Sequence, residues 1–180
     1  MLLTHDQMMA HWRRAHGYEP ERADCSVEVF DGVDATPRLA LEMRQWYLDL
    51  LDNAPVTLLC PHDVAGTEAR EVRSGVWALA LPAAARRVLS LTVAGSAVPV
   101  RVLSHDRDRG TAAWRRLRCL LTNPYAPAPQ QPLAIADGSQ IMVYCPTRPQ
   151  VTAIRVINDP GDEVYEFDES ALGLLYRTKQ

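Results

Sequence analysis

The sequence has no uninterrupted apolar run of the roughly 20 residues that a membrane-spanning helix needs. Its most apolar stretch, residues 76–103, is cut into short pieces by Pro82, Gly95 and Pro99. The N-terminus carries polar and acidic residues where a secretory signal would have a cationic start and an apolar core. We therefore expect a soluble protein that is made in the cytoplasm and has no membrane partner.

Closely spaced cysteines are also absent. Cys25, Cys60, Cys119 and Cys145 lie far apart and form no CxxC pair, the spacing that zinc sites favour. In a reducing compartment, isolated cysteines behave as small buried hydrophobic residues. The cysteines therefore predict neither a zinc site nor a disulfide framework.

The common catalytic and phosphate-binding motifs are missing: the chain has no GxGxxG, GxxxxGK[ST], HExxH or GxSxG. The formal net charge of −3 gives no general attraction to nucleic acid, which needs a basic surface excess. These absences favour a protein that is not an enzyme, binds no cofactor and has no strong nucleic-acid signal.

What the sequence does contain is typical of one globular domain. The chain has 180 residues, of which 47% are hydrophobic and 23% charged, values far from those of disordered or fibrous proteins. A chain of this length buries a core without help from metals or disulfides. We predict a single domain over residues 1–180, in which residues 1–35 form a helix and an acidic connection and residues 36–180 form the main body.

Apolar residues at helical spacing predict several helices. The clearest covers residues 37–53, with Thr36 as its N-cap and Pro37 at its first position. Others are expected over residues 4–16, after Asp63, from about Ala113 through Leu121 with an end near Asn123-Pro124, and after Asp168.

Strand patterns and turn signals alternate through the rest of the chain. Strands are predicted over residues 75–81, 88–93, 98–103, 133–136, 140–144, 151–157 and 164–167. Asp137-Gly138 is a strong hairpin turn between two of them. The predicted fold class is α+β: N-terminal helices, a small antiparallel meander, an intervening helix and a short C-terminal helix.

A proline-rich arm follows the intervening helix and should be extended and semi-rigid. Its candidate protein-contact residues are Asn123, Pro124, Tyr125, Pro127, Pro129 and Pro132. The arm could dock on a neighbouring surface, or it could fold back on its own domain. The sequence leaves both possibilities open.

The intervening helix is basic on one side. Arg115, Arg116 and Arg118 form a candidate basic contact face, and Arg107 and Arg109 precede them. Arginines in this arrangement can bind phosphates or an acidic partner. A solvated helix face explains the same pattern.

Three histidines precede an aspartate: His5-Asp6, His62-Asp63 and His105-Asp106. Neighbouring His and Asp residues supply metal ligands in some hydrolases, so the last two pairs define an alternative metal site. Aspartates at these predicted caps and loops are also ordinary N-cap residues.

Several short motifs together resemble a known family. These are Leu81-Pro82, Arg87-Val88 and Asn123-Pro124-Tyr125, within the order helix, strand, meander, helix, arm and hairpin. Over residues 36–180 the chain resembles the head-to-tail connector, or tail tubular, proteins of phage necks. The resemblance implies a ring of copies between portal and tail, and no catalytic residues. This chain has a shorter helical part and no long tail-facing extension.

Three functional hypotheses follow. The first is a non-enzymatic structural or assembly protein that works through self-association or contacts with other assembly proteins, in the cytoplasm or, if phage-derived, in the virion. The second is a metal-dependent hydrolase that uses His62-Asp63 and His105-Asp106. The third is a module that binds a small ligand or a peptide through the sheet face and the proline arm.

Overall fold

The computed structural model describes residues 1–17, 29–30, 33–34, 36–105, 107–123 and 125–177. The chain divides into two compact units, which are described separately below. Unit 1 comprises Met1–Cys60 and Asp159–Gln180, and unit 2 comprises Pro61–Asn158. In sequence, unit 2 is thus an insertion into unit 1. The expectation of a single folding domain over residues 1–180 stays a prediction.

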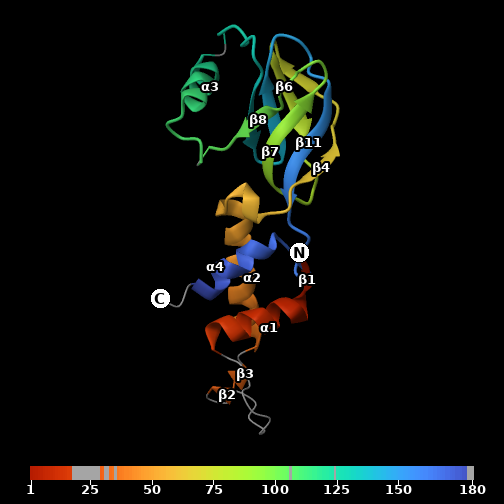
Figure 1. The fold of residues 1–180 in the computed structure, drawn as a ribbon. Helices are drawn as coiled ribbons and strands as arrows, with labels where there is room; N and C mark the ends of the chain where they lie inside the picture. Colours follow the sequence, from red (N-terminus) through yellow and green to blue (C-terminus); the bar gives the residue numbers. More distant parts are fainter. Residues whose placement is uncertain (18–28, 31–32, 35, 106, 124, 178–180) are drawn as a thin grey trace. The chain divides into compact units, whose positions relative to one another are not determined.

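Unit 1 holds most of the helices (Figure 1). Its elements are β1 (Leu2–Thr4), α1 (His5–His16), β2 (Val29–Phe30), β3 (Val33–Asp34), α2 (Thr36–Asn53), the 3-10 turn Val56–Leu58, β12 (Val164–Glu166), the 3-10 turn Glu169–Ala171 and α4 (Leu172–Arg177). Strand β1 pairs antiparallel with β12, so the first and last parts of the chain meet here. Strands β2 and β3 form a separate antiparallel pair.

The two long helices of unit 1 confirm their predictions. Thr4 caps α1 through a capping box with Gln7, and Gly17 ends the helix at φ 77°. Helix α2 buries the apolar side predicted for it, with Met43, Tyr47 and Leu51 fully enclosed. Amphipathic spacing was sufficient to locate both helices.

Aromatic side chains form the centre of unit 1. The rings of Tyr47 and Tyr165 lie 4.9 Å apart in an edge-to-face arrangement, and Trp46 meets Phe167 edge-on at 6.3 Å. The N-terminal amine of Met1 donates a hydrogen bond to the Phe167 carbonyl at 2.8 Å. The segment after residue 158 therefore completes the core that α2 begins.

Unit 2 is built on one large sheet. Its elements are β4 (His62–Ala65), β5 (Arg70–Arg73), β6 (Val76–Ala80), β7 (Ala85–Val93), β8 (Val100–Leu103), α3 (Ala112–Thr122), β9 (Leu133–Asp137), β10 (Gln140–Tyr144) and β11 (Val151–Asn158). The strand order is β4-β11-β7-β8-β9-β10-β6-β5. All neighbours are antiparallel except β8 and β9, which pair in parallel.

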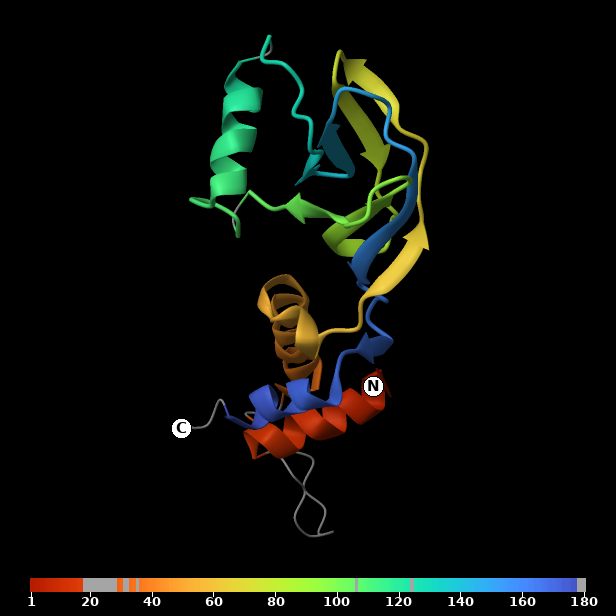
Figure 2. The same cartoon turned by 45° about the horizontal axis from the view of Figure 1, so that its top comes forward.

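The sheet curls, and its two edge strands are joined by a short segment, residues 66–69 (Figures 1 and 2). The Gly66 amide donates to the Thr152 carbonyl at 3.1 Å, next to one edge. The Thr67 hydroxyl donates to the Ala80 carbonyl at 3.1 Å, near the other. The segment thus ties β11 to β6 across the gap between the edges.

The two faces of the sheet bury different residues because side chains alternate along each strand. One face encloses a core that includes Leu79, Leu91, Val102, Ala134, Ile141, Val143, Ile154 and Val156. The other face, formed by Val76, Leu103, Ile135 and Tyr144, packs against Trp114, Leu117 and Leu120 of α3. Helix α3 lies beside the sheet in both views (Figures 1 and 2).

The predicted fold class was wrong, because it gave the helices too large a part in the fold and the sheet too small a part. The sheet is neither small nor a simple antiparallel meander: it has eight strands, is mixed and is the largest element of the described chain. The architecture is led by the sheet and not by the N-terminal helices. Strands β6, β7 and β8 form, but they do not make the predicted meander: β7 pairs with β8, whereas β6 pairs with β10 and β5.

One predicted helix was also wrong. The stretch after Asp63 forms strands β4 and β5 instead of a helix. Strand β4 pairs with β11, and β5 pairs with β6, so tertiary pairing overrides a weak helical pattern. Among the described residues, no helix is long and apolar enough to cross a membrane.

Candidate functional site

Helix α3 carries the basic residues that the sequence singled out, and its position is set by the apolar face beneath it. Trp114, Leu117 and Leu120 are buried against the sheet. Arg115, Arg116 and Arg118 are exposed because they occupy the remaining sides of the helix. Core packing therefore orients the arginines outward.

The loop that leads into α3 is organised around Asp108, the one buried charged residue among those the structure describes, with 3% of its surface exposed. Its carboxylate accepts from Arg101 Nη2 at 2.5 Å and from the Ser104 amide at 2.7 Å. Its carbonyl accepts from both the amide and the hydroxyl of Thr111, which in turn caps α3 by accepting from the Trp114 amide. Asp108 thus holds the loop through its carboxylate and the start of the helix through its carbonyl.

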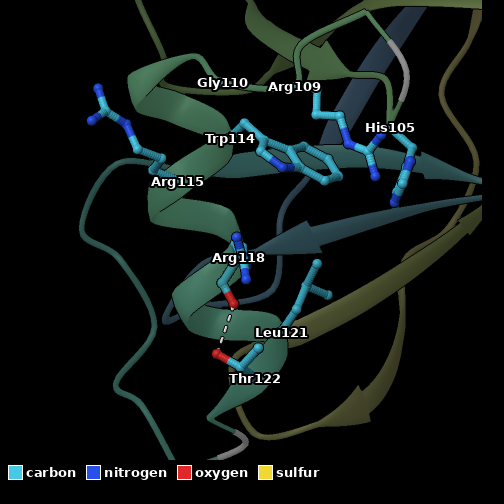
Figure 3. Close-up of a pocket in the computed structure, with 8 residues that line it drawn as sticks. All are labelled: His105, Arg109, Gly110, Trp114, Arg115, Arg118, Leu121 and Thr122. Atoms are coloured by element: carbon cyan, nitrogen blue, oxygen red, sulfur yellow. Dashed lines mark hydrogen bonds between the residues drawn. The ribbon is translucent and has the colours of Figure 1, made fainter.

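A pocket of about 580 Å³ lies between this loop and α3 (Figure 3). It is lined by His105, Arg109, Gly110, Trp114, Arg115, Arg118, Leu121 and Thr122. The His105 ring meets the Trp114 ring edge-on at 5.0 Å, and Arg109 lies next to them in Figure 3. No carboxylate is among the lining residues, so the pocket combines an apolar floor with a cationic rim.

The pocket contains part of the predicted basic face. Arg115 and Arg118 line it, whereas Arg116 does not. The sequence did not point to His105, Trp114 or Leu121 as members of this site. Trp114 is 8% exposed and packs against the sheet, and it also forms the floor of the pocket. One feature of the sequence could have indicated the pocket: Arg109 precedes the helix, and in the structure it lines the pocket together with Arg115 and Arg118.

The proline-rich arm folds back on unit 2 at several points. Ala126 packs against the cluster under α3, Pro129 is buried, and Pro132 lines a second hollow of about 520 Å³ beside β8 and β9. A Cβ on Gly75 would approach Ala128 Cβ to 2.6 Å, which shows how closely the arm sits on the β5–β6 turn. Of the two possibilities left open, the structure favours folding back.

Other residues of the arm point outward. Tyr125 is 93% exposed, and Asn123 and Pro127 are also exposed. The Tyr125 amide donates to Asn123 Oδ1 at 3.1 Å, so the backbone at the tyrosine is held even though its ring has little cover. Pro124 lies outside the described residues.

The two units carry opposite charge, a feature that the overall value of −3 conceals. Residues 61–158 contain 12 arginines and six acidic residues, a formal charge of +6. The remaining residues contain seven basic and 16 acidic residues, a formal charge of −9. The charges can be counted in the sequence, but the boundaries between which to count them come from the fold.

The His-Asp pairs gain no support as a metal site. His62 and Asp63 are consecutive on β4, so their side chains point to opposite faces of the strand. His105 lines the basic pocket, and Asp106 lies outside the described residues. The described part of the chain holds no group of three or more His, Cys, Asp or Glu residues that could bind a metal. The hydrolase hypothesis stays a prediction.

No protein-family model matches the chain, and no curated protein matches it either.

Proposed function

We propose that this protein is a non-enzymatic assembly protein that acts through protein-protein contacts, including contacts between its own copies. The observation that carries the proposal is the opposite formal charge of unit 2, +6, and of the rest of the chain, −9. Complementary charge speeds encounter and selects partners. Two copies of this chain are complementary when the basic unit of one meets the acidic unit of the other.

A contact of this kind joins two different surfaces. Two copies can make it twice, in a reciprocal two-fold dimer, or make it once and leave one unused surface on each end of the pair. Further copies add at those surfaces until a ring closes or a filament grows. The charge pattern therefore supports self-association, and the ring implied by the resemblance to phage connectors is the head-to-tail form that we propose.

The arm adds a second contact element to this proposal. Tyr125 presents a nearly fully exposed aromatic ring from a backbone that is anchored on both sides by Asn123 and Ala126. Exposed aromatic residues on ordered backbone are frequent anchors of protein interfaces, because little entropy is lost when they are buried.

The resemblance to phage head-to-tail connector proteins suggests the setting. A ring-forming adaptor between portal and tail is made in the host cytoplasm and ends in the virion, and we extend the proposal to this role. It needs neither a catalytic group nor a cofactor.

Native mass spectrometry over a range of protein concentrations tests the proposal. We expect oligomers that grow with concentration and dissociate as ammonium acetate rises, because salt screens the attraction between the units. A monomer at every concentration, or an oligomer that does not respond to salt, contradicts it. The same spectra report any stoichiometric metal, which would favour the hydrolase hypothesis.

A further inference from the structure

We propose that the pocket on α3 receives the exposed side of α2 from a second copy of the chain. This inference rests on the proposed function and names the two surfaces that meet. In it, Leu41 of one copy enters the apolar floor formed by Trp114 and Leu121 of the other. The acidic residues beside Leu41 then face the arginines at the rim.

The pocket selects a partner with a particular chemistry. Its rim carries Arg109, Arg115 and Arg118, and no acidic side chain among the described residues forms an ion pair with these three. Its floor includes Leu121. This leucine is 47% exposed among cationic side chains, which is an unusual environment for an apolar residue. An apolar side chain set between carboxylates satisfies both halves of the site.

Helix α2 carries an exposed leucine and carboxylates on its outer side, where Arg38 also lies one turn before Leu41. Leu41 is 70% exposed, the same fraction as Val98 and one of the largest values for an apolar residue in the described chain. Glu42, Gln45 and Asp49 follow at spacings that place them on the same side of the helix. Glu42 pairs with Arg38 at 2.8 Å, and Asp49 accepts from Gln45 at 3.2 Å, so Asp49 is the carboxylate less neutralised by a cation.

The pocket is built before any partner arrives. Asp108 fixes the loop through Arg101 and Ser104, and Thr111 fixes the first turn of α3. A backbone that is already held in place loses little conformational entropy when the arginines that it carries bind. Bidentate pairs between arginine and carboxylate are then available without rearrangement of the backbone.

Nucleic acid is a weaker fit to the same site. Phosphates would satisfy Arg109, Arg115 and Arg118 but would leave Leu121 without an apolar partner. The 16 acidic residues outside unit 2 would also repel a polyanion. A second copy satisfies the cations, the leucine and the charge of the whole chain together.

The test uses two full-length variants with reversed charge. The pocket variant carries Arg109→Glu and Arg118→Glu, and the helix variant carries Leu41→Arg and Asp49→Arg. All four positions are exposed, so both variants should keep the wild-type circular dichroism. We expect each variant alone to raise the dissociation constant of self-association about 100-fold, measured by sedimentation velocity.

Mixing the two variants makes the test specific. In an equimolar mixture, the reversed pocket of one variant faces the reversed helix of the other, and each unchanged surface also meets an unchanged partner. We therefore expect the mixture to regain assembly with alternating copies. Restored assembly also shows that neither variant failed through misfolding.

A matched control separates this inference from the broader proposal. Arg70→Glu with Arg155→Glu changes the charge of unit 2 by the same amount at exposed positions outside the pocket. If the control weakens assembly as much as the pocket variant, long-range charge drives association and the pocket assignment is wrong.

Two other results also contradict the pocket assignment. In one, the pocket variant assembles as well as the wild type; in the other, the mixture of the two variants stays monomeric. A wild type that never assembles overturns the proposed function as well. If the pocket variant loses binding to a short DNA duplex but keeps its self-association, the pocket binds nucleic acid instead.

Discussion

The hydroxyl of Tyr47 and the backbone of Glu166 exchange two hydrogen bonds within unit 1. The hydroxyl donates to the Glu166 carbonyl at 3.2 Å and accepts from the Glu166 amide at 2.9 Å. Tyr47 is fully buried, and burial raises its pKa to about 12. A single phenol thus joins the middle of α2 to β12, although 119 positions separate the two residues.

Replacement of Tyr47 by phenylalanine should destabilise unit 1 by about 1–3 kcal/mol at neutral pH, because the Glu166 amide loses its buried acceptor. Below pH 10 the phenol is protonated in both the folded and the unfolded chain, so its contribution to stability is fully present. Above pH 10 the unfolded chain loses this proton first, and the contribution is lost as the pH rises through 12. Urea titrations at pH 7 and between pH 10 and 12 should show a shallower alkaline loss for Tyr47→Phe. Equal alkaline slopes in both proteins would contradict this. Burial also raises the pKa of Tyr144 and Tyr165, so some slope remains.

Gly66 should not tolerate a side chain. A Cβ at this position would lie 1.9 Å from the Val151 carbonyl oxygen, a backbone atom that cannot move aside cheaply. We expect Gly66→Ala to lower the free energy of unfolding by at least about 2 kcal/mol, since the segment that joins the sheet edges must shift. Gly173→Ala is the matched control, because nothing lies within 4 Å of its Cβ, and it should be neutral or slightly stabilising. Equal effects at both sites would show that crowding is not the cause.

Asp108→Ala should loosen the start of α3. The change removes the acceptor of the Ser104 amide and of Arg101, at an expected cost of about 1–3 kcal/mol. Hydrogen exchange should rise in residues 104–111 and in the first turn of the helix more than in β10. Glu71→Ala, at an exposed carboxylate of β5, serves as the control and should change little. Unchanged protection around Thr111 would mean that the sheet alone positions the helix.

Tyr125→Ser tests the arm without dismantling it. Deletion of residues 124–132 would also remove Ala126 and Pro129, which pack on unit 2, so a loss of assembly would be ambiguous. Because the tyrosine ring is exposed, the substitution should leave the thermal midpoint within about 2 °C of wild type, as surface changes usually do. Self-association should weaken several-fold by sedimentation. Wild-type assembly would show that the ring takes no part in contacts.

The helices of this protein could be predicted because their signals are local. Thr4, Gly17 and the apolar side of α2 each act within a few residues, and the structure confirms them. The hairpin of β9 and β10 around Asp137-Gly138 is local in the same sense. The presence of a helix or a hairpin could therefore be predicted wherever caps, turns and periodicity agreed.

The sheet could not be predicted for the opposite reason. Strands β4 and β5 are short, and their partners lie in β11 and β6. The parallel pairing of Val102 with Ala134 needs the chain to leave the sheet, form α3 and return through the arm. No local pattern encodes such pairings.

The pocket was partly within reach of the sequence. Arg115 and Arg118 were identified from their spacing on the helix. His105 and Trp114 were not, because only the fold of the loop around Asp108 brings the histidine ring against the indole. The charge of each unit was countable, but the unit boundaries at residues 60–61 and 158–159 emerge only from the fold.

The insertion of unit 2 into unit 1 sets the order in which the protein can fold during synthesis. Strand β1 must wait for β12, so unit 1 stays incomplete until Glu166 has left the ribosome. Unit 2 contains all the partners of its own sheet, and its ends are adjacent because His62 pairs with Val156. At 5–20 residues per second, its 98 residues take roughly 5–20 s to emerge. The basic unit is therefore finished before the acidic unit closes, and a nascent chain displays its α3 pocket before its own α2 is locked in place.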